Sequence, residues 1–447
     1  MIQRDVKYLL DTKLYEMLKE KFEVILLVGI PYDRDFEKSY GGDHVSIVNI
    51  NVDNAKPVPG AVQKVFMKYL LFHLDFMLGD QEIGRFNQSI KKKIYPRQYK
   101  ICKTIYKFSP LFMAGPVFSR LAGRLFKHKK IEEIVGRHRP DLVISTTPAK
   151  LFIEYCLHRA AKKEGIPLVF YPSSWDDFTR SGIFPFAPDK VLSWGPEMSR
   201  HAVEFLGLPK SGIVDVGQVR MEASREIKAS QSALRRHFDI PEDHKVILVA
   251  TNRPHMGLAL PRIIAELLED MEAGRLGKAV LLLRPNNTRP ENQRVYIERF
   301  KDHPLVRINL PESDGDESWR GQASLQWREI ISSVDVVVTV CSMMILEAFH
   351  YDVPVVNPNY NYGMLNQYGL DYVFNYDREV FQSISRMGGT TMADDREGLV
   401  KALKAYLEDP ALHQDRRERV MEQWDARPAP PDTRSATALR ALEGSLA

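Results

Sequence analysis

The chain has 447 residues, of which 44% are hydrophobic and 27% are charged, and its formal net charge is +4. This length and composition are typical of a globular protein with two or three domains and exclude an intrinsically disordered chain. Cys102, Cys156 and Cys341 lie far apart in the sequence, which excludes a disulfide framework and a cysteine-rich metal site and favours a reducing compartment.

The N-terminal sequence is charged and amphipathic, and it predicts one helix over residues 4–21 rather than a signal peptide. A doubly wound domain normally begins with a strand, so this start suggests a shortened N-terminus. Charges interrupt the apolar runs elsewhere before they reach the ~18 residues that a transmembrane helix needs. We therefore expect a cytoplasmic protein that at most lies on a membrane surface.

Short β-branched runs alternate with helical stretches in the first half of the chain, which is the pattern of a parallel sheet built from βαβ units. A helix is expected over 151–165, with Gly165 as its C-terminal stop. The predicted strands are 22–29, 44–50, 141–147, 167–174, 189–194 and 212–217.

Residues 60–139 break this alternation, since they are helical, aromatic and basic in pattern. Residues 61–140 contain 17 lysines and arginines against five acidic residues, so the rest of the chain is net negative. We predict a helical basic insertion in the N-terminal domain. Two interpretations stay open: a helical cap with solvated lysines, or a surface for a lipid-linked or polyanionic acceptor.

The second half repeats the α/β pattern after a linker near 221–244. In the helix predicted over 324–334, Trp327, Ile330, Ile331 and Val334 are spaced to form one buried stripe. The predicted strands are 245–250, 279–285, 305–310, 335–340 and 353–358, and the other predicted helices are 260–274, 342–350 and 397–409.

We therefore predict an α/β fold with two Rossmann-like domains that face a central cleft. Residues 1–222 would form an N-terminal acceptor domain, which includes the basic insertion at 60–139. Residues 223–447 would form a C-terminal donor domain, whose last helix packs back on the N-terminal domain.

The segment 332–361 has the strongest functional signal. A buried strand leads through a turn at Ser342, the predicted N-cap, into a helix. Ligands of open α/β sheets bind beyond the carboxyl ends of the strands, and the free amides at the start of this helix, near Met343, suit a diphosphate. Glu347, one turn further on, could accept hydrogen bonds from ribose. The alternative is a simple cap at Ser342 and a solvated Glu347.

A family resemblance becomes visible at these residues. The pattern D-x-x-x-T-x-x-S-x-x-x-x-E-A, followed by VPVVNP, resembles the donor-binding domain of GT-B glycosyltransferases and is similar to that of CDP-glycerol glycerophosphotransferases. The resemblance implies that Ser342 and the Met343 amide contact the donor diphosphate, and that Glu347 contacts the ribose.

Two further stretches of the second half support this resemblance. In LLLRPNN, Arg284 stands where such enzymes place a basic residue that neutralises phosphate, but Asn286 replaces a frequent histidine. This departure argues against a histidine-assisted glycerophosphotransferase. In VATNRPHMG, the first strand-to-loop step of the domain, Thr251, Asn252 and Arg253 are expected beside the donor phosphates.

The stretch SSWDDFTRSG is similar to an S-W-D-N-x-T-x-x-G pattern of bacterial surface-glycan transferases, with Asp177 in place of the asparagine. Transfer to an acceptor hydroxyl needs a base that takes its proton, and Asp176 and Asp177 are the candidates. Trp175 and Ser174 would contact the acceptor. The alternative is that the two aspartates only cap a turn.

Together these patterns predict a metal-independent glycosyltransferase that moves a sugar from a nucleotide-diphosphate donor to a surface polysaccharide or lipid-linked acceptor of the cell envelope. Arg284 and Arg253 would stabilise the leaving diphosphate, no D-x-D motif is present, and no cofactor is expected. The basic segment would bring the enzyme to the anionic inner face of the cell membrane.

Three alternatives stay open. A CDP-glycerol-type glycerophosphotransferase would use the same donor site. A sugar-nucleotide 2-epimerase shares the layout, but its S-G-G-x-x-E-E turn is absent. A non-enzymatic protein could bind nucleic acid through the basic segment, although the sequence contains none of the usual recognition motifs.

Overall fold

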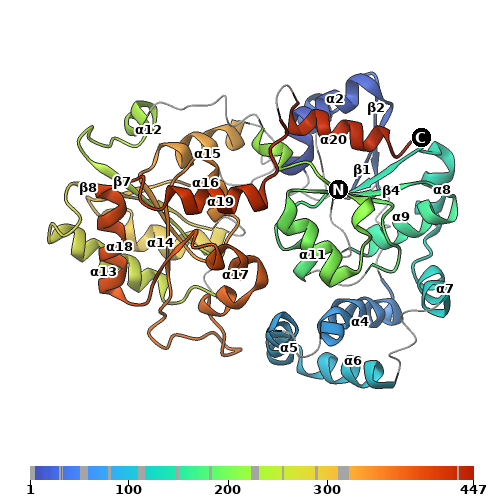
Figure 1. The fold of residues 1–447 in the computed structure, drawn as a ribbon, viewed down its shortest axis with the longest axis horizontal. Helices are drawn as coiled ribbons and strands as arrows, with labels where there is room; N and C mark the ends of the chain where they lie inside the picture. Colours follow the sequence, from blue (N-terminus) through green and yellow to red (C-terminus); the bar gives the residue numbers. More distant parts are fainter. Residues whose placement is uncertain are drawn as a thin grey trace. The chain divides into compact units, whose positions relative to one another are not determined.

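The chain forms two compact units, each described here by itself (Figure 1). The first comprises Met1–Glu222 and Gln423–Ala447, and the second comprises Ala223–Glu422. The predicted domain boundary lies at the same residue, but residues 423–447 belong to the first unit. The structure is a computed structural model that describes residues 6–29, 32, 34–50, 59–78, 82–108, 116–146, 151–180, 184–222, 231–253, 256–286, 290–310, 322–429 and 432–446.

The first unit contains parallel strands, as the alternating sequence pattern predicts. Each of the six strands predicted for this half is present in shorter form. A four-stranded sheet has the order β3 (Val143–Ser145), β4 (Leu168–Phe170), β5 (Lys190–Ser193) and β6 (Ile213–Asp215). A separate pair joins β1 (Val24–Val28) to β2 (Val45–Asn49) in parallel.

Helices connect these strands, and parallel pairing needs such crossovers. The connecting helices are α3 (Arg34–Tyr40), α9 (Phe152–Lys163), α10 (Asp177–Arg180) and α11 (Pro196–Leu206), with short 3₁₀ turns at Lys210–Gly212 and Val219–Met221.

The prediction of one continuous N-terminal helix is wrong. A π-helical turn, η1 (Val6–Leu10), is followed by a separate helix, α2 (Lys13–Lys21). Thr12 divides them, because its hydroxyl donates to the carbonyl of Leu9 at 2.5 Å and accepts from the amide of Tyr15 at 3.4 Å. A threonine that caps in this way starts a new helix.

Five helices occupy the region between β2 and β3: α4 (Ala61–Leu78), α5 (Glu82–Ile94), α6 (Pro96–Phe108), α7 (Pro116–Leu125) and α8 (Lys129–His138). Phe66, Phe126 and Ile131 share a hydrophobic core with Tyr155 and Cys156 of α9, so α4, α8 and the segment after α7 pack against the α/β part of the unit. We call α4, α5 and α6 the α4–α6 group. It has a core of its own, formed by Tyr69, Phe72, Phe76, Tyr99 and Cys102.

The last helix, α20 (Arg434–Glu443), packs against α2 in the first unit. Leu439 and Leu442 share a core with Leu14 of α2. A buried ion pair of 2.6 Å joins Arg434 to Asp425, whose second oxygen accepts from the amide of Gln218 at 2.8 Å. Apolar packing and a buried charge pair thus both hold the C-terminal segment in this unit.

The second unit has one sheet of six parallel strands in the order β12-β11-β10-β7-β8-β9. The strands are β7 (Lys245–Ala250), β8 (Ala279–Arg284), β9 (Val306–Ile308), β10 (Val336–Thr339), β11 (Val355–Pro358) and β12 (Thr391–Ala393). Five of them confirm the prediction, and β12, of three residues, was not predicted. The central strands are almost wholly apolar and buried, as expected for a parallel sheet covered on both faces.

Helices precede the first strand of the second unit, connect its strands along the chain and follow the last strand (Figure 1). They are α12 (Gln231–His237), α13 (Leu260–Glu272), α14 (Pro290–Phe300), α15 (Gln322–Ser333), α16 (Met344–His350), α17 (Glu379–Arg386) and α18 (Arg396–Glu408), followed by α19 (Gln414–Trp424) at the return to the first unit. In the part of the chain that the structure describes, no helix is both long and apolar enough to span a bilayer.

Candidate functional site

The predicted donor-binding residues meet at one edge of the second sheet. Strand β7 lies between β10 and β8, and the parallel register places Ala250 opposite both Thr339 and Arg284. The three strands therefore end at the same level. The segments that follow them, which begin near Thr251, Arg284 and Val340, lie side by side at the edge where α/β sheets bind ligands.

Arg284 is the principal charge of this edge. Its guanidinium donates a hydrogen bond to the Asn309 side chain and lies over the Trp327 ring, 4.1 Å from the ring centroid. Burial lowers the pKa of Arg284 to about 10, and the negative charge of Glu347 opposes this shift. No carboxylate of a described residue lies at ion-pair distance from Arg284. The side chain is thus a partly buried cation that remains charged at neutral pH.

Trp327 connects Arg284 to Glu347. Its indole nitrogen donates to the Glu347 carboxylate at 2.7 Å, while its ring covers Arg284. Glu347 is only 9% exposed, so the alternative of a solvated residue is wrong. The helical spacing correctly predicts that Ile330 and Ile331 are buried, but it does not reveal that Trp327, on the same stripe, lies at the ligand edge. Trp327 is the site residue that the sequence analysis missed.

The turn before α16 differs from the prediction by one residue. Met343, not Ser342, occupies the N-cap, and its backbone is helical. The Ser342 hydroxyl accepts from the amide of Met344 at 3.3 Å, so it closes the turn from the position before the cap. The helix that follows has seven residues. The backbone of this turn therefore keeps its predicted place at the end of β10, and the Ser342 side chain is engaged within it.

The loops after β7 and β8 are tied to each other. The Thr251 amide donates to the Arg284 carbonyl at 3.1 Å, and the Asn286 amide donates to the Thr251 hydroxyl at 3.0 Å. Asn252 has a buried side-chain oxygen with no hydrogen-bond partner among the described residues. Arg253 is exposed. Beside the Arg284 strand, these loops therefore contain an exposed cation and a buried amide oxygen that no described residue bonds.

Gly257 limits the space beside Asn252. A Cβ atom at this position would lie 2.1 Å from the Asn252 side-chain oxygen and 2.8 Å from Leu260. A side chain at position 257 would therefore require the side chains of Asn252 and Leu260 to move.

The four predicted residues of the N-terminal domain lie after β4. Asp177, fully buried, accepts from the amides of Ser173 and Ser174 at 2.9 and 3.0 Å, and Asp176 accepts from the Ser174 hydroxyl at 2.6 Å. Trp175 is 5% exposed and packs against Trp424. The contacts of Asp177 are those of a turn cap. The catalytic and acceptor-binding roles of these residues stay predictions.

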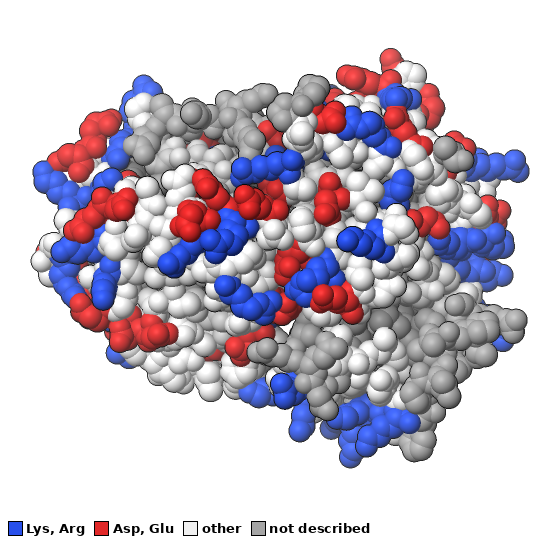
Figure 2. Space-filling model, viewed as in Figure 1, with Lys and Arg blue, Asp and Glu red and all other residues white. Residues whose placement is uncertain are grey.

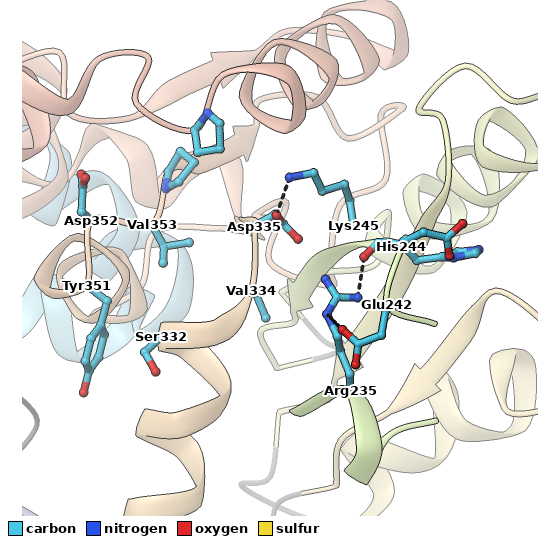
Figure 3. A pocket seen from close by; sticks show the side chains of 13 residues that line it. Arg235, Glu242, His244, Lys245, Ser332, Val334, Asp335, Tyr351, Asp352 and Val353 are labelled. Carbon is cyan, nitrogen blue, oxygen red and sulfur yellow. Dashed lines mark hydrogen bonds and ion pairs between the residues drawn. The ribbon is translucent and has the colours of Figure 1, made fainter. Parts of the chain in front are cut away.

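A pocket of about 460 Å³ lies at the opposite edge of the second sheet, near the start of β7 and before β10 (Figure 3). Lys245 and Asp335 form an ion pair of 3.0 Å there, and Arg235 donates to the carbonyls of Pro241 and His244. Its central charges are therefore already used within the protein. We do not assign the donor to this pocket, because the amino ends of parallel strands are not their ligand-binding edge.

No protein-family model matches the sequence, and no curated protein matches it. Among solved structures, the chain is similar to the UDP-GlcNAc 2-epimerase from Neisseria meningitidis bound to UDP-GlcNAc, with 11% identity, 74% of this chain and 80% of that chain covered, and a TM-score of 0.43. A glycosyltransferase from Rickettsia africae matches with 13% identity over 95% of this chain and 98% of that chain, at a TM-score of 0.43. The wall teichoic acid polymerase TagF matches with 14% identity over 60% and 57%, at a TM-score of 0.37.

Proposed function

We propose that the protein is a GT-B-type glycosyltransferase that moves a sugar from a nucleotide-diphosphate sugar to a surface polysaccharide or lipid-linked acceptor. The partly buried guanidinium of Arg284 at the carboxyl edge of the second sheet carries this proposal. It lies where α/β sheets bind nucleotides, and no carboxylate of the described residues forms an ion pair with it. A diphosphate would supply the missing negative charge.

The chemistry of Arg284 suits this role. A guanidinium presents several donors in one plane and can bind two phosphate oxygens at once. A cation that Trp327 partly shields from water binds an anion more strongly than a fully exposed one does. Arg253, exposed on the loop after β7, would add a second positive charge, and the backbone at Met343 would donate to the same diphosphate.

The transfer step follows from these charges. The bond between the sugar carbon and the β-phosphate oxygen breaks while the acceptor oxygen bonds to that carbon. Arg284 and Arg253 would stabilise the negative charge that develops on the leaving diphosphate, which is why we propose a reaction without a metal ion. Asp176 is the proposed base for the acceptor proton, in preference to the fully buried Asp177. Ser174 and Trp175, on the same loop, are proposed to position the acceptor.

Glu347 is the proposed partner of the donor ribose. The indole of Trp327 fixes its carboxylate at 2.7 Å, so the acceptor oxygens of Glu347 have a defined direction. Thr251, Asn252 and Asn286 would complete the donor site from the two loops that are tied to each other. The buried oxygen of Asn252 is suited to accept from a donor hydroxyl or base.

Glycerophosphate transfer from CDP-glycerol is the second candidate, because it places a nucleotide diphosphate on the same residues. Asn286, in place of the frequent histidine, favours sugar transfer over this reaction. We also propose that the enzyme works in the cytoplasm, at the inner face of the cell membrane, where envelope acceptors are assembled.

Calorimetry with UDP, UDP-sugars and CDP-glycerol tests the donor site. Arg284→Ala should weaken nucleotide affinity by about 10- to 100-fold, since a hydrogen bond to a charged group contributes ~1.5–3 kcal/mol. Arg294→Ala is the matched control, because Arg294 is an exposed arginine of the same unit whose partner is Glu298. The proposal fails if no nucleotide binds, or if both variants bind it as the wild type does.

Product analysis separates the candidate reactions. Sugar transfer releases the nucleoside diphosphate and needs an acceptor, whereas glycerophosphate transfer from CDP-glycerol releases CMP. An epimerase changes the sugar nucleotide with no acceptor present.

A further inference from the structure

The outer surface of α6 carries aliphatic and basic side chains side by side. Ile101 and Ile105 are 54% and 39% exposed and lie one helical turn apart. Four basic residues of the same helix are also exposed: Arg97, Lys100, Lys103 and Lys107. The inner side of α6 is formed by Tyr99 and Cys102, which are buried in the core of the α4–α6 group.

The positive charge extends to α5 and is not balanced locally. Residues 84–108 contain no aspartate or glutamate. Lys92, Arg97, Lys100 and Lys107 form no ion pair with any carboxylate of the described residues. Figure 2 shows basic side chains over α5 and α6, at the lower edge of the view, with no acidic side chain visible among them. This surface therefore suits an anionic partner.

Lys91 shows how a lysine of this group behaves when it has a structural role. It forms an ion pair with the buried Asp75 and donates to the Leu71 carbonyl at 2.7 Å. Lys103 of α6 also touches the core, because it donates to the hydroxyl of the buried Tyr99 at 3.4 Å. Lys100 and Lys107 make no side-chain bond to any described residue, so the folding of the group does not explain their presence. Ile101 and Ile105 are exposed and absent from the core. Lys100, Lys107 and the two isoleucines are thus exposed side chains that the core does not use.

We infer that this face, formed by α6 and the exposed lysines of α5, binds the surface of an anionic phospholipid membrane. The lysines would meet the phosphate groups, and Ile101 and Ile105 would enter the boundary of the acyl chains. Nucleic acid is the weaker fit, because binding to single strands uses exposed aromatic rings. Phe72, Phe76 and Tyr99 are buried in the core instead. Aliphatic side chains gain free energy only in an apolar environment, which lipid provides.

The inference extends the proposed function, since a lipid-linked acceptor would lie in the same membrane, but its test requires no catalysis. The full chain is sedimented with vesicles of phosphatidylcholine alone, and with vesicles of phosphatidylcholine and phosphatidylglycerol in equal parts. We expect binding to the anionic vesicles alone, and weaker binding as the salt concentration rises.

Three variants locate the surface. Lys100→Gln, Lys103→Gln and Lys107→Gln together should lower the partition coefficient about 100-fold, or roughly fivefold for each lysine. Ile101→Gln with Ile105→Gln should lower it about tenfold or more. The control combines Lys38→Gln, Lys401→Gln and Lys404→Gln, which removes the same charge from exposed positions elsewhere and should bind as the wild type does.

Two results would overturn the inference: wild-type protein that does not sediment with anionic vesicles, or an isoleucine variant that binds them unchanged. A single-stranded oligonucleotide that binds tightly, and depends on the lysines but not on the isoleucines, would identify a nucleic-acid surface instead. Circular dichroism checks that the variants fold. Nucleotide affinity should remain unchanged in all of them, so a failure of this inference is distinct from a failure of the proposed donor site.

Discussion

Replacing Trp327 with phenylalanine separates two contacts that this side chain makes. The change removes the indole donor that bonds Glu347 at 2.7 Å and keeps an aromatic ring over Arg284. A hydrogen bond to a charged acceptor contributes ~1.5–3 kcal/mol, and we expect about half of this to be lost from donor binding once Glu347 is no longer held in place. This loss of ~0.75–1.5 kcal/mol corresponds to a decrease in nucleotide affinity of about 4- to 13-fold.

A double-mutant cycle measured by calorimetry tests this prediction. Glu347→Ala should lower donor affinity at least several-fold without unfolding the protein. In the Glu347→Ala background, Trp327→Phe should have almost no further effect, because the bond that it removes no longer exists. Trp327→Leu should cost ~0.5–1 kcal/mol more than Trp327→Phe, since it also removes the ring from Arg284.

The reasoning is refuted if the effects of Trp327→Phe and Glu347→Ala on nucleotide affinity add independently, because independent effects mean that the indole does not act through Glu347. Wild-type affinity in Trp327→Phe would have the same consequence. Unchanged affinity in Glu347→Ala would remove Glu347 from the donor site.

Three further predictions concern the first unit. Asp176→Asn should abolish turnover with little change in donor affinity, and wild-type turnover in this variant would end its assignment as the base. Asp425→Ala should destabilise the first unit by ~3–5 kcal/mol in urea denaturation, because it leaves the buried Arg434 uncompensated. The control Arg440→Ala, at an exposed ion pair, should cost ~0–1 kcal/mol. Equal effects of the two changes would contradict this account. Burial lowers the pKa of His158 to about 3, so the unfolded state binds a proton that the folded state does not, and stability should fall as the pH decreases from about 6.5 towards 3. His158→Gln should reduce this dependence, and an unchanged pH profile of the urea midpoint would show that another group causes it.

The sequence was sufficient for every described strand except β12 and for the edge of the proposed donor site. Runs such as KVILVA and DVVVTV are apolar at every position, and a strand of this kind is stable only inside a covered parallel sheet. The carboxyl ends of parallel strands lie at the same edge of a sheet. The residues at these ends, Thr251, Arg284 and Ser342, could therefore be assigned to one edge.

What could not be predicted depends on the direction of individual side chains. Periodicity places Trp327 on the buried stripe of its helix, but the bond of its indole to Glu347 depends on how α15 and α16 pack. The same limit applies to Thr12, whose hydroxyl ends one helical turn and starts the next helix. It applies also to Trp175, since its contact with Trp424 joins residues that are far apart in the sequence.

The return of residues 423–447 to the first unit has a consequence for the order in which the protein can be completed during synthesis. The second unit is one continuous stretch, Ala223–Glu422, so all of its described strands are synthesised before α20 of the first unit. The first unit must wait for the final helix, because Leu14 of its first long helix packs against Leu439 and Leu442. A chain cut directly after Glu422 would therefore contain the whole second unit and lack part of the first one.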